Sequence, residues 1–406
     1  MGDAGTDAGT DAGSDAGIGN TLDTAPISAS VAAKDEFETH LAVAPNGTIG
    51  VSWTEEAISG PFPIGYAFSK DGGKTWTAPK RIFSLDGGRA ADSVLVTDAQ
   101  SVFLLVWIGD AAVYAARQQA DGSFGTPVEI SDPAAGHTYD KPWAVQTGGK
   151  FLVTYQEQTA DTTNGDASDL DRGVAAVSTD GQHWTRNVMT EEDAGRNLYY
   201  PCTSPNADRV WVVFHNIDGT IGMRWSTTNG TQWTTSDLIV SDHETDIPFS
   251  EPECVANNDE VWLIYGESDD DPANGMNSKH TTLHLAHSKA GAAVDYRSVK
   301  SHDTADEKFY LQPQLGRSPD GTLDLTYYAG RADNDALGSF RWARSTDGGK
   351  TFAKSVTVRE PVVFTQDRPT SQWPGDYSGL GYWNGAVVMS YIDNAIGASH
   401  VAFARR

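Results

Sequence analysis

Glutamates at the ends of predicted β-strands are the side chains of this sequence best suited to acid–base chemistry. Glu251 precedes a predicted strand, and Glu55, Glu157 and Glu267 follow strands of a similar kind. Two carboxyl groups on either side of a glycosidic bond can act as general acid and general base. Their separation distinguishes retaining from inverting hydrolysis, and a lyase reaction that uses tyrosine and histidine is a third alternative. The sequence leaves these three reactions open.

Polar and aromatic residues also gather at the starts of predicted inner strands. In a closed ring of strands these positions surround one funnel, where they predict a site for a polar ligand. The candidate binding residues are His40, Asp92, Asp140, Lys141, Trp143, Tyr199, Tyr200, His215, Glu253, Gln312, Arg331, Trp373 and Asp376. A glycan suits this set, because aromatic rings stack on sugar faces while carboxylates and amides bind hydroxyl groups. The alternatives are a channel lined by solvated side chains and aromatic rings that only pack the strand ends.

A repeated motif indicates which elements position these residues. Residues 69–76 read SKDGGKTW, and residues 345–352 repeat them as STDGGKTF. Worn copies occur at 178–184 and at 226–233, where we expect Asn229 to replace the acid. The Asp of such a motif caps backbone amides of a tight turn, and its glycine supplies a positive φ. The motif therefore predicts structure and says nothing of a reaction.

Seven runs rich in valine, isoleucine, leucine and aromatic residues recur along the chain. They are residues 49–53, 103–107, 151–155, 210–214, 261–265, 323–328 and 387–391. Each run reads as a strand, and each is followed by a further strand. The pattern predicts an all-β fold, a seven-bladed β-propeller with four-stranded antiparallel blades. The last repeat lacks an outer strand, so a strand from residues 21–32 is expected to close the ring.

The motif resembles the Asp-box, or BNR repeat, of the sialidase-like superfamily of propellers, and the resemblance covers nearly the whole chain at the level of the fold. Residues 250–253 resemble the Ser-Glu-Pro segment of sialidases, and residues 376–378 resemble the strand that carries their tyrosine nucleophile. The resemblance implies that Glu251 acts as the base for Tyr377, because a phenol with a pKa of about 10 needs one. Glu267 is a further catalytic candidate.

The resemblance fails at the arginines that sialidases use to clamp the carboxylate of their substrate. Residues 36–39 read EFET where the first arginine is expected, and Glu267 stands in the place of the second. Arg331 and Arg368 are the remaining candidates for a clamp. Sialidases also have six blades, which is the alternative to the seven counted here. The sequence therefore favours a divergent glycan-cleaving hydrolase or lyase over a true exo-sialidase.

The net charge of -26 disfavours one class of partner. Proteins that bind nucleic acids neutralise phosphates with lysine and arginine, so no nucleic-acid partner is expected. Apolar runs long enough for a transmembrane segment are also absent from the sequence. A soluble monomer with a glycan or another polar small ligand as its partner is predicted.

Residues 1–20 repeat an Asp-Ala-Gly-Thr unit that offers no large apolar side chain for burial. They predict a disordered tether ahead of a single propeller domain, residues 21–406. The repeat resembles the linkers that follow the lipidated cysteine of exported bacterial lipoproteins. This resemblance implies an extracellular or outer-surface protein, and the alternative is an ordinary flexible tail.

Two features carry weaker predictions. Cys202 and Cys254 fall near the starts of neighbouring inner strands, so a disulfide and two buried thiols are alternatives. Acidic loops at 159–172 and 268–279 either hold structural calcium or are simply solvated. No catalytic metal or cofactor is predicted. A non-catalytic, surface-anchored lectin-like or protein-interaction scaffold is the alternative to an enzyme.

Overall fold

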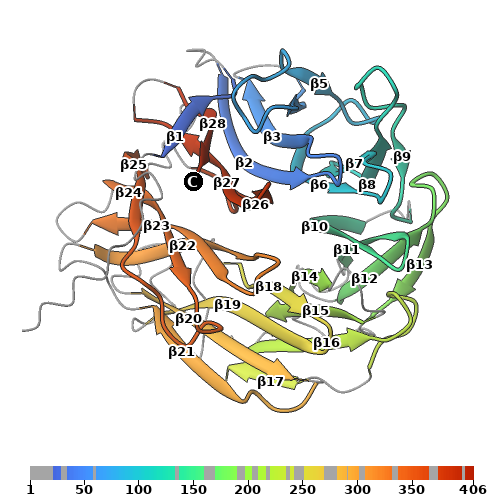
Figure 1. The fold of residues 1–406 in the computed structure, drawn as a ribbon. Coiled ribbons are helices and arrows are strands. Elements are labelled where there is room, and N and C mark those ends of the chain that lie inside the picture. Colours follow the sequence, from blue (N-terminus) through green and yellow to red (C-terminus); the bar gives the residue numbers. More distant parts are fainter. Residues whose placement is uncertain are drawn as a thin grey trace, which may run out of the picture.

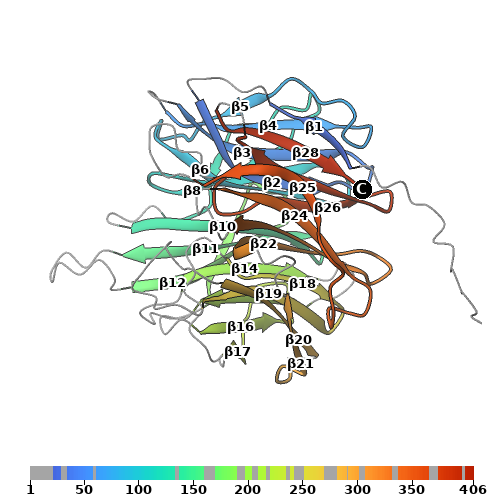
Figure 2. The ribbon, with the colours of Figure 1, turned by 90° about the vertical axis from the view of Figure 1, so that its left-hand side faces the viewer.

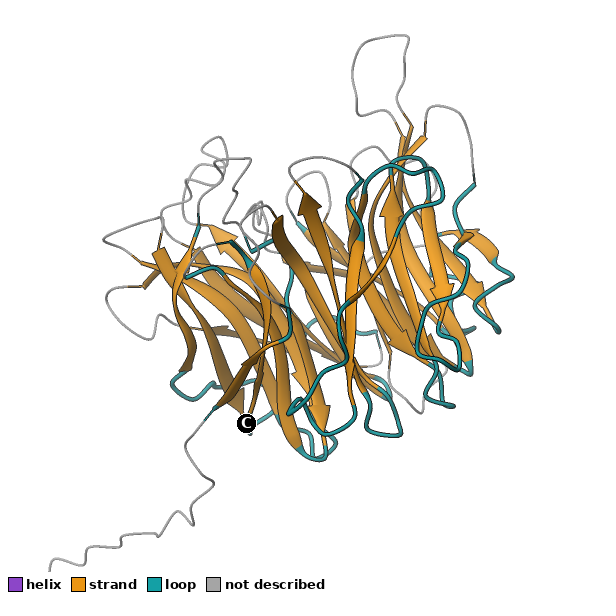
Figure 3. Ribbon diagram, turned by 90° about the horizontal axis from the view of Figure 1, so that it is seen from above, coloured by secondary structure: helices purple, strands orange, loops and turns teal. Residues whose placement is uncertain are grey.

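The seven-bladed ring predicted from the repeats is confirmed. The computed structural model describes residues 22–28, 34–57, 61–132, 137–159, 170–189, 197–203, 209–215, 220–234, 238–241, 251–268, 281–289, 291–300, 307–331, 337–364, 374–395 and 398–406. Its strands form seven sheets of four antiparallel strands each, arranged around a ring with one strand of each sheet nearest the middle (Figure 1). The six-bladed alternative is therefore wrong. In the part of the chain that is described, no helix is long and apolar enough to cross a membrane, and Figure 3 shows strands and loops only.

Each of the first six blades uses four consecutive strands, running from the middle of the ring outwards. Blades one to three are β2 (Lys34–Val43), β3 (Ile49–Ala57), β4 (Ile64–Ser69) and β5 (Lys80–Ile82); β6 (Ala90–Thr97), β7 (Phe103–Gly109), β8 (Val113–Arg117) and β9 (Val128–Glu129); and β10 (His137–Thr147), β11 (Lys150–Thr159), β12 (Leu170–Ser178) and β13 (Thr185–Val188).

Blades four to six are β14 (Asn197–Thr203), β15 (Val210–His215), β16 (Ile221–Ser226) and β17 (Leu238–Ser241); β18 (Glu253–Asn257), β19 (Glu260–Ser268), β20 (Thr281–Lys289) and β21 (Tyr296–Lys300); and β22 (Glu307–Arg317), β23 (Leu323–Arg331), β24 (Leu337–Ser345) and β25 (Val356–Val363). The seventh blade is β26 (Gly379–Trp383), β27 (Ala386–Asp393), β28 (His400–Arg405) and β1 (Asp23–Pro26).

The second strand of each blade is apolar on both sides because a neighbouring blade packs on each face. β15, with the sequence VWVVFH, is buried along its whole length, whereas the outer strand β5, with the sequence KRI, is exposed at two of its three residues. A continuous apolar run is typical of a strand covered on both faces. Seen edge-on, the blades stack side by side around the ring (Figure 2).

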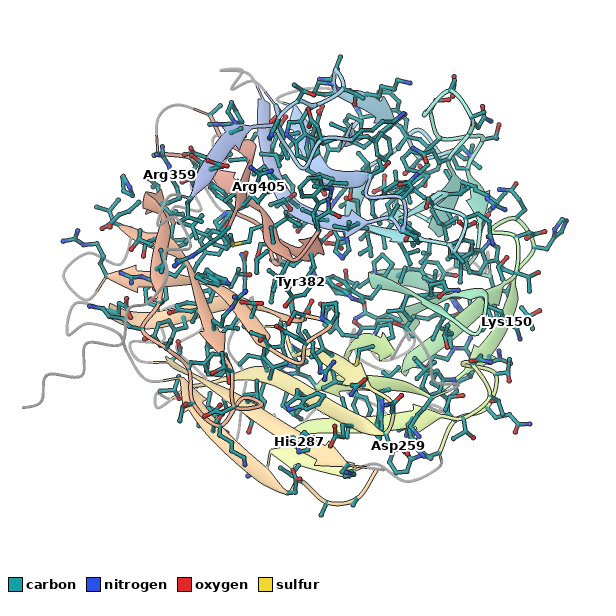
Figure 4. The ribbon with its side chains drawn as sticks, in the orientation of Figure 1. Lys150, Asp259, His287, Arg359, Tyr382 and Arg405 are labelled. Atoms are coloured by element: carbon teal, nitrogen blue, oxygen red, sulfur yellow. A yellow bond between two sulfur atoms is a disulfide. The ribbon has the colours of Figure 1, made fainter. Side chains whose placement is uncertain are left out.

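The ring closes by pairing two distant parts of the chain. Four residues of β1 pair with β28, from Asp23 opposite Arg405 to Pro26 opposite Ala402. Arg405, labelled in Figure 4, also forms an ion pair with Asp23 at 2.7 Å. The prediction that residues 21–32 supply the missing outer strand is therefore confirmed.

The repeated motif forms a turn between third and fourth strands. Asp71 Oδ1 accepts a hydrogen bond from the Thr75 amide at 2.9 Å, and Ser69 Oγ accepts one from the Gly73 amide at 2.8 Å. Gly73 has a φ of +85°, and a β-carbon there would collide with Phe403. Only glycine therefore fits this position without a shift of its neighbours.

One detail of the worn copy at 226–233 differs from the sequence interpretation. Thr228, rather than Asn229, takes the place of the acid, because its hydroxyl accepts a hydrogen bond from the Gln232 amide at 2.9 Å. Asn229 has a φ of 54° and stands where the first copy has Gly72, with a φ of 75°. Asparagine tolerates this left-handed conformation better than most residues with a side chain.

Candidate functional site

Five inner strands carry a β-bulge close to where they begin. The pairing registers of β2, β6, β10, β14 and β22 with their second strands each skip there. Two residues of the inner strand therefore face one residue of the second strand. That single residue is always a fully buried aromatic: Trp53, Trp107, Tyr155, Phe214 and Tyr327.

The first bulged residue carries a polar side chain in four of these strands. Glu38, Asp92, Lys141 and Gln312 have φ values between 44° and 54°. A left-handed residue inside a bulge re-aims its side chain. We call the side of the ring where the inner strands begin the bulge face. The opposite side, where the Ser-x-Asp turns lie, is the turn face.

Two carboxylates contact the ammonium group of Lys141, and a third, that of Glu38, lies beside them. Its Nζ lies 3.2 Å from Asp92 Oδ1 and also contacts Asp376 Oδ2. Glu38 Oε2 accepts a hydrogen bond from the Asp92 amide at 3.3 Å and another from Thr54 Oγ1 at 3.1 Å. We call Glu38, Asp92, Lys141 and Asp376 the axial charge cluster. It links side chains from four blades across the middle of the ring.

The charges of the axial charge cluster depend on one another. Burial alone lowers the pKa of Lys141, but Asp376, Asp92 and Glu38 outweigh burial and hold it well above its usual value. Burial raises the pKa of Asp92, yet Lys141 and Arg89 hold it below its usual value. Burial and the charge of Asp92 raise the pKa of Glu38. The cluster therefore holds a charged lysine beside ionised Asp92.

The spacing of the three acids would also suit a cation. One oxygen each of Glu38, Asp92 and Asp376 lie within 4.8 Å of one another. The ammonium group of Lys141 contacts two of these three acids. The ammonium group of Lys141 thus supplies a positive charge beside the three acids.

Two further carboxyl groups at the bulge face have pKa values shifted towards neutrality. Burial, followed by the charges of Asp376, Asp140 and Asp92, raises the pKa of Glu251 to about 8, although Lys141 opposes the shift. Burial and the charge of Asp92 raise the pKa of Asp140 to about 6. Titratable groups with values in this range are candidates for proton transfer at neutral pH.

The two axial tyrosines differ in their hydroxyl partners. Tyr377 is buried and donates its hydroxyl to the Ser93 carbonyl at 3.1 Å. The buried hydroxyl of Tyr200 has no hydrogen-bond partner among the described residues. Burial and then the charge of Glu251 hold the pKa of Tyr200 well above its usual value. The geometry therefore offers Tyr200, as well as Tyr377, as a phenol within the electrostatic reach of this region.

Trp143 lies among these aromatic rings. Its ring is edge-on to His40 at 5.1 Å, to Tyr200 at 4.9 Å and to Tyr377 at 5.3 Å between ring centroids. Such perpendicular pairs stabilise an aromatic cluster. Trp143 is 8% exposed, so most of its surface serves packing.

The glutamates at the ends of second strands have a different environment. Glu267 pairs with His284 at 2.9 Å, Glu55 with Arg81 at 2.5 Å, and Glu157 with His137, Arg172 and Arg186. Each of these pairs lies within one blade. A strand-end position in the sequence therefore does not bring these acids to the axial charge cluster, since partners within the same blade hold them.

The remaining predicted residues are spread over several environments. Gln312 donates from Nε2 to the Gly375 carbonyl. His215 is buried at the end of β15, and burial lowers its pKa to about 4. Arg331 ends β23 opposite Glu307. Trp373, Arg368 and the side chain of Tyr199 lie outside the described residues, as do most of both acidic loops proposed to hold calcium.

Sequence reasoning missed Glu38 as a member of the cluster. Its signal was positional, because Glu38 precedes the regular part of β2 just as Asp92 and Lys141 precede theirs. The uncertain disulfide is present, since Cys202 and Cys254 are bonded with their Cα atoms 5.6 Å apart.

A cavity of about 680 Å³ lies on the ring axis next to the aromatic cluster. His40, Trp143, Glu253 and Gln314 line it at the level just past the bulges, and Asp98 and Arg317 line it nearer the turn face. The cavity wall receives residues from the inner strands of all seven blades. The volume is in the range of small-molecule sites.

Comparison with solved structures places the fold beside known propellers. A protein of unknown function from Dyadobacter fermentans superposes with a TM-score of 0.56 at 14% identity, over 95% of this chain and 98% of that one. The Hadza microbial sialidase Hz136 superposes with a TM-score of 0.51 at 13% identity, over 72% of this chain and 63% of that one. The fold is similar to that of a sialidase. At these identities the likeness concerns the fold alone.

Matches at the sequence level are lacking. No protein-family model matches the chain, and no curated protein matches it.

Proposed function

We propose that this propeller binds a glycan at the bulge face and cleaves it by acid–base catalysis, with Glu251 as the general acid. The observation that carries the proposal is that two carboxyl groups, Glu251 and Asp140, lie within electrostatic reach of each other and of the axial charge cluster. Glu251, with a pKa of about 8, is mostly protonated at neutral pH and can donate a proton to a glycosidic oxygen. Asp140, with a pKa of about 6, is mostly ionised and can act as base or nucleophile.

The charges at this face favour an uncharged sugar over sialic acid. Lys141 is the lysine of the axial charge cluster, and Asp92 and Asp376 already contact its ammonium group. A substrate carboxylate would meet the ionised Asp92 beside an ammonium group that is already paired, whereas a carboxylate is matched best by a free arginine fork. The similarity of the fold to that of a sialidase supports a carbohydrate ligand, and the charges at the bulge face argue against sialic acid as that ligand.

The test is to screen neutral oligosaccharides for released reducing ends and to compare two glutamate variants. Glu251→Gln should lower the rate by about 10²–10⁴-fold, as expected for loss of a general acid. Glu267→Gln is the matched control, because Glu267 pairs with His284 inside its blade, and it should keep most of the activity. Equal losses in both variants, or none in Glu251→Gln, would refute the assignment.

A non-catalytic lectin-like or protein-interaction scaffold is the second candidate. It is favoured by the internal neutralisation of the axial charge cluster and by the Tyr377 hydroxyl, which is committed to the Ser93 carbonyl. Glycan binding without turnover would select this candidate.

Export is part of the same proposal. The disulfide between Cys202 and Cys254 supports it, because such bonds persist in oxidising compartments. The predicted tether, residues 1–20, lies outside the described residues. Structural calcium and a monomeric state stay predictions.

A further inference from the structure

The axial cavity combines apolar walls with a few converging polar groups. Leu41, Val145 and Leu315 contribute to its walls, and the Cys202–Cys254 disulfide forms part of them. Small-molecule sites likewise combine apolar walls with a small number of placed polar groups that fix the ligand. The axial charge cluster, the aromatic cluster and the cavity follow one another along the ring axis. The cavity comes last, because its residues follow the bulges along the inner strands.

A carboxyl group with one unsatisfied oxygen lines this cavity. Glu253 is 7% exposed, and its Oε1 has no hydrogen-bond partner among the described residues. Burial raises its pKa to about 8, although hydrogen bonds from the Gln314 side chain and the Leu315 amide oppose the shift. At neutral pH the group is therefore mostly an uncharged acid with free hydrogen-bonding capacity. A buried polar atom without a partner costs free energy that a ligand can recover.

His40 contributes a second uncharged polar group. Its Nδ1 accepts a hydrogen bond from the Leu95 amide at 3.2 Å, so the ring proton lies on Nε2. Burial lowers the pKa of His40 to about 3, which keeps the ring neutral at physiological pH. His40, Glu253 and Gln314 thus offer both donors and acceptors without carrying charge.

Two charged residues, Asp98 and Arg317, line the end of the cavity nearer the turn face. Asp98 accepts a hydrogen bond from Arg117 at 2.8 Å. The guanidinium of Arg317 lies over the ring of Trp262, 5.2 Å from its centroid, and its Nε has no hydrogen-bond partner among the described residues. Beside Glu253, Gln314 and His40, whose groups are uncharged, a charged ligand would lose its hydration without meeting a counter-charge, which is costly.

We infer that the axial cavity is a second ligand site, separate from the bulge face, that takes a small uncharged molecule bearing several hydroxyl groups, such as a monosaccharide or a cyclic polyol. Hydroxyl groups match the donors and acceptors of Glu253, Gln314 and His40. The C–H faces of such a molecule match the apolar walls. The inference is independent of whether the bulge face is catalytic.

Titration calorimetry with glucose, galactose, xylose and myo-inositol tests the inference, with glucuronate and glucosamine as charged counterparts. At least one neutral probe should bind, and each charged counterpart should bind at least tenfold more weakly. Ala42→Phe fills the cavity, because Ala42 lines it, and should abolish binding. Ala111→Phe places the same side chain at an exposed position and should leave binding unchanged.

Two further variants distinguish a loss of binding at the cavity from misfolding and from binding at the bulge face. Gln314→Leu should weaken binding about tenfold while the protein keeps a cooperative unfolding transition. Glu251→Gln should leave binding unchanged, because Glu251 belongs to the bulge face. The inference is overturned if no neutral probe binds, if charged probes bind as tightly, or if Glu251→Gln removes binding while Gln314→Leu does not.

Discussion

Carboxyl groups at the rim of the ring, in the turns between third and fourth strands, have an environment opposite to that of carboxyl groups on the ring axis. At the rim, Asp71 and Asp347 accept hydrogen bonds from the side chains and amides of Thr75 and Thr351, which lower the pKa of each acid to about 2. On the axis, burial raises the pKa values of Glu251 and Glu253 to about 8. The same chemical group is thus an ionised cap in one region and a buried, mostly neutral acid in the other.

The difference explains why the most recognisable part of the sequence is the least informative about chemistry. A capped turn uses neighbours within a few residues, so its residues recur as a motif. On the axis the bulges carry different residues, such as Glu38, Asp92 and Lys141, and the partners of Lys141 come from other blades. Function at the axis therefore leaves no repeated signature.

Removing the lysine of the axial charge cluster should have the largest effect. Lys141→Met leaves Asp92 and Asp376 without the cation that they contact, and loss of one partner of a buried ion pair costs roughly 3–5 kcal/mol of unfolding free energy. Urea unfolding followed by tryptophan fluorescence measures the loss. The exposed Lys74→Met at the rim is the control and should change little. Similar losses in both variants would contradict the comparison, and Asp376→Asn added to Lys141→Met should restore part of the loss.

The disulfide extends the comparison to covalent bonds. Cys202 and Cys254 are separated by 52 residues and join two neighbouring inner strands. Replacing both with serine should lower the unfolding free energy by roughly 2–4 kcal/mol, since the unfolded chain gains freedom. Dithiothreitol should shift the wild type by the same amount and leave the double variant unchanged. A wild type that is insensitive to the reductant while its bond is demonstrably reduced would contradict this.

The two regions should respond to pH with opposite signs. Glu253 has a pKa of about 8 in the folded protein against 4.5 for an ordinary glutamate, so stability falls as pH rises through this window. Asp347 has a pKa of about 2 against 3.8, so its contribution is lost as pH falls through that lower window. Glu253→Gln should raise the Tm by several degrees at pH 8.5 and change little at pH 4.5.

Differential scanning calorimetry between pH 4 and pH 9 measures this dependence, with the exposed Glu360→Gln as the control. If Glu253→Gln and Glu360→Gln show parallel pH profiles, the assignment of Glu253 as a buried neutral acid is wrong.

The rim turn should give the smallest effect. Asp347→Ala removes the acceptor of hydrogen bonds from the Thr351 amide and hydroxyl, at 2.9 and 2.6 Å. Loss of a comparable cap costs about 1 kcal/mol. Thr351→Val removes only the hydroxyl donor and should cost less, as measured by urea unfolding. A loss as large as that of Lys141→Met would remove the distinction between rim and axis.

Much of the fold could be predicted because local sequence determines it. Both faces of each second strand are covered, so runs such as residues 210–214 and 261–265 stand out as continuous apolar segments. The closing strand could be predicted because the seventh blade lacked its outer strand. Copies of the motif located the turns. In the worn copy, however, the predicted replacement for the acid, Asn229, was one residue away from the observed one, Thr228.

The site could be predicted only in part, because it depends on distances between blades. Positions at the starts of inner strands did identify Asp92, Lys141 and Asp376, which the structure brings together. The sequence places Glu38 ahead of the regular part of β2, but the bulge and the left-handed backbone that bring it into the cluster are features of the folded chain. The partner of Glu267 lies on a neighbouring strand, which no spacing in the sequence specifies.

The pairing of β1 with β28 makes the order of synthesis matter. Asp23 leaves the ribosome early, whereas its partner Arg405 follows 382 residues later. Until then, the apolar wall of Val51 and Trp53, which packs against Val388 and Phe403 in the finished ring, has nothing to cover it. A nascent chain must therefore carry six blades with an open seam, and an early stop before β28 leaves an apolar edge available for aggregation.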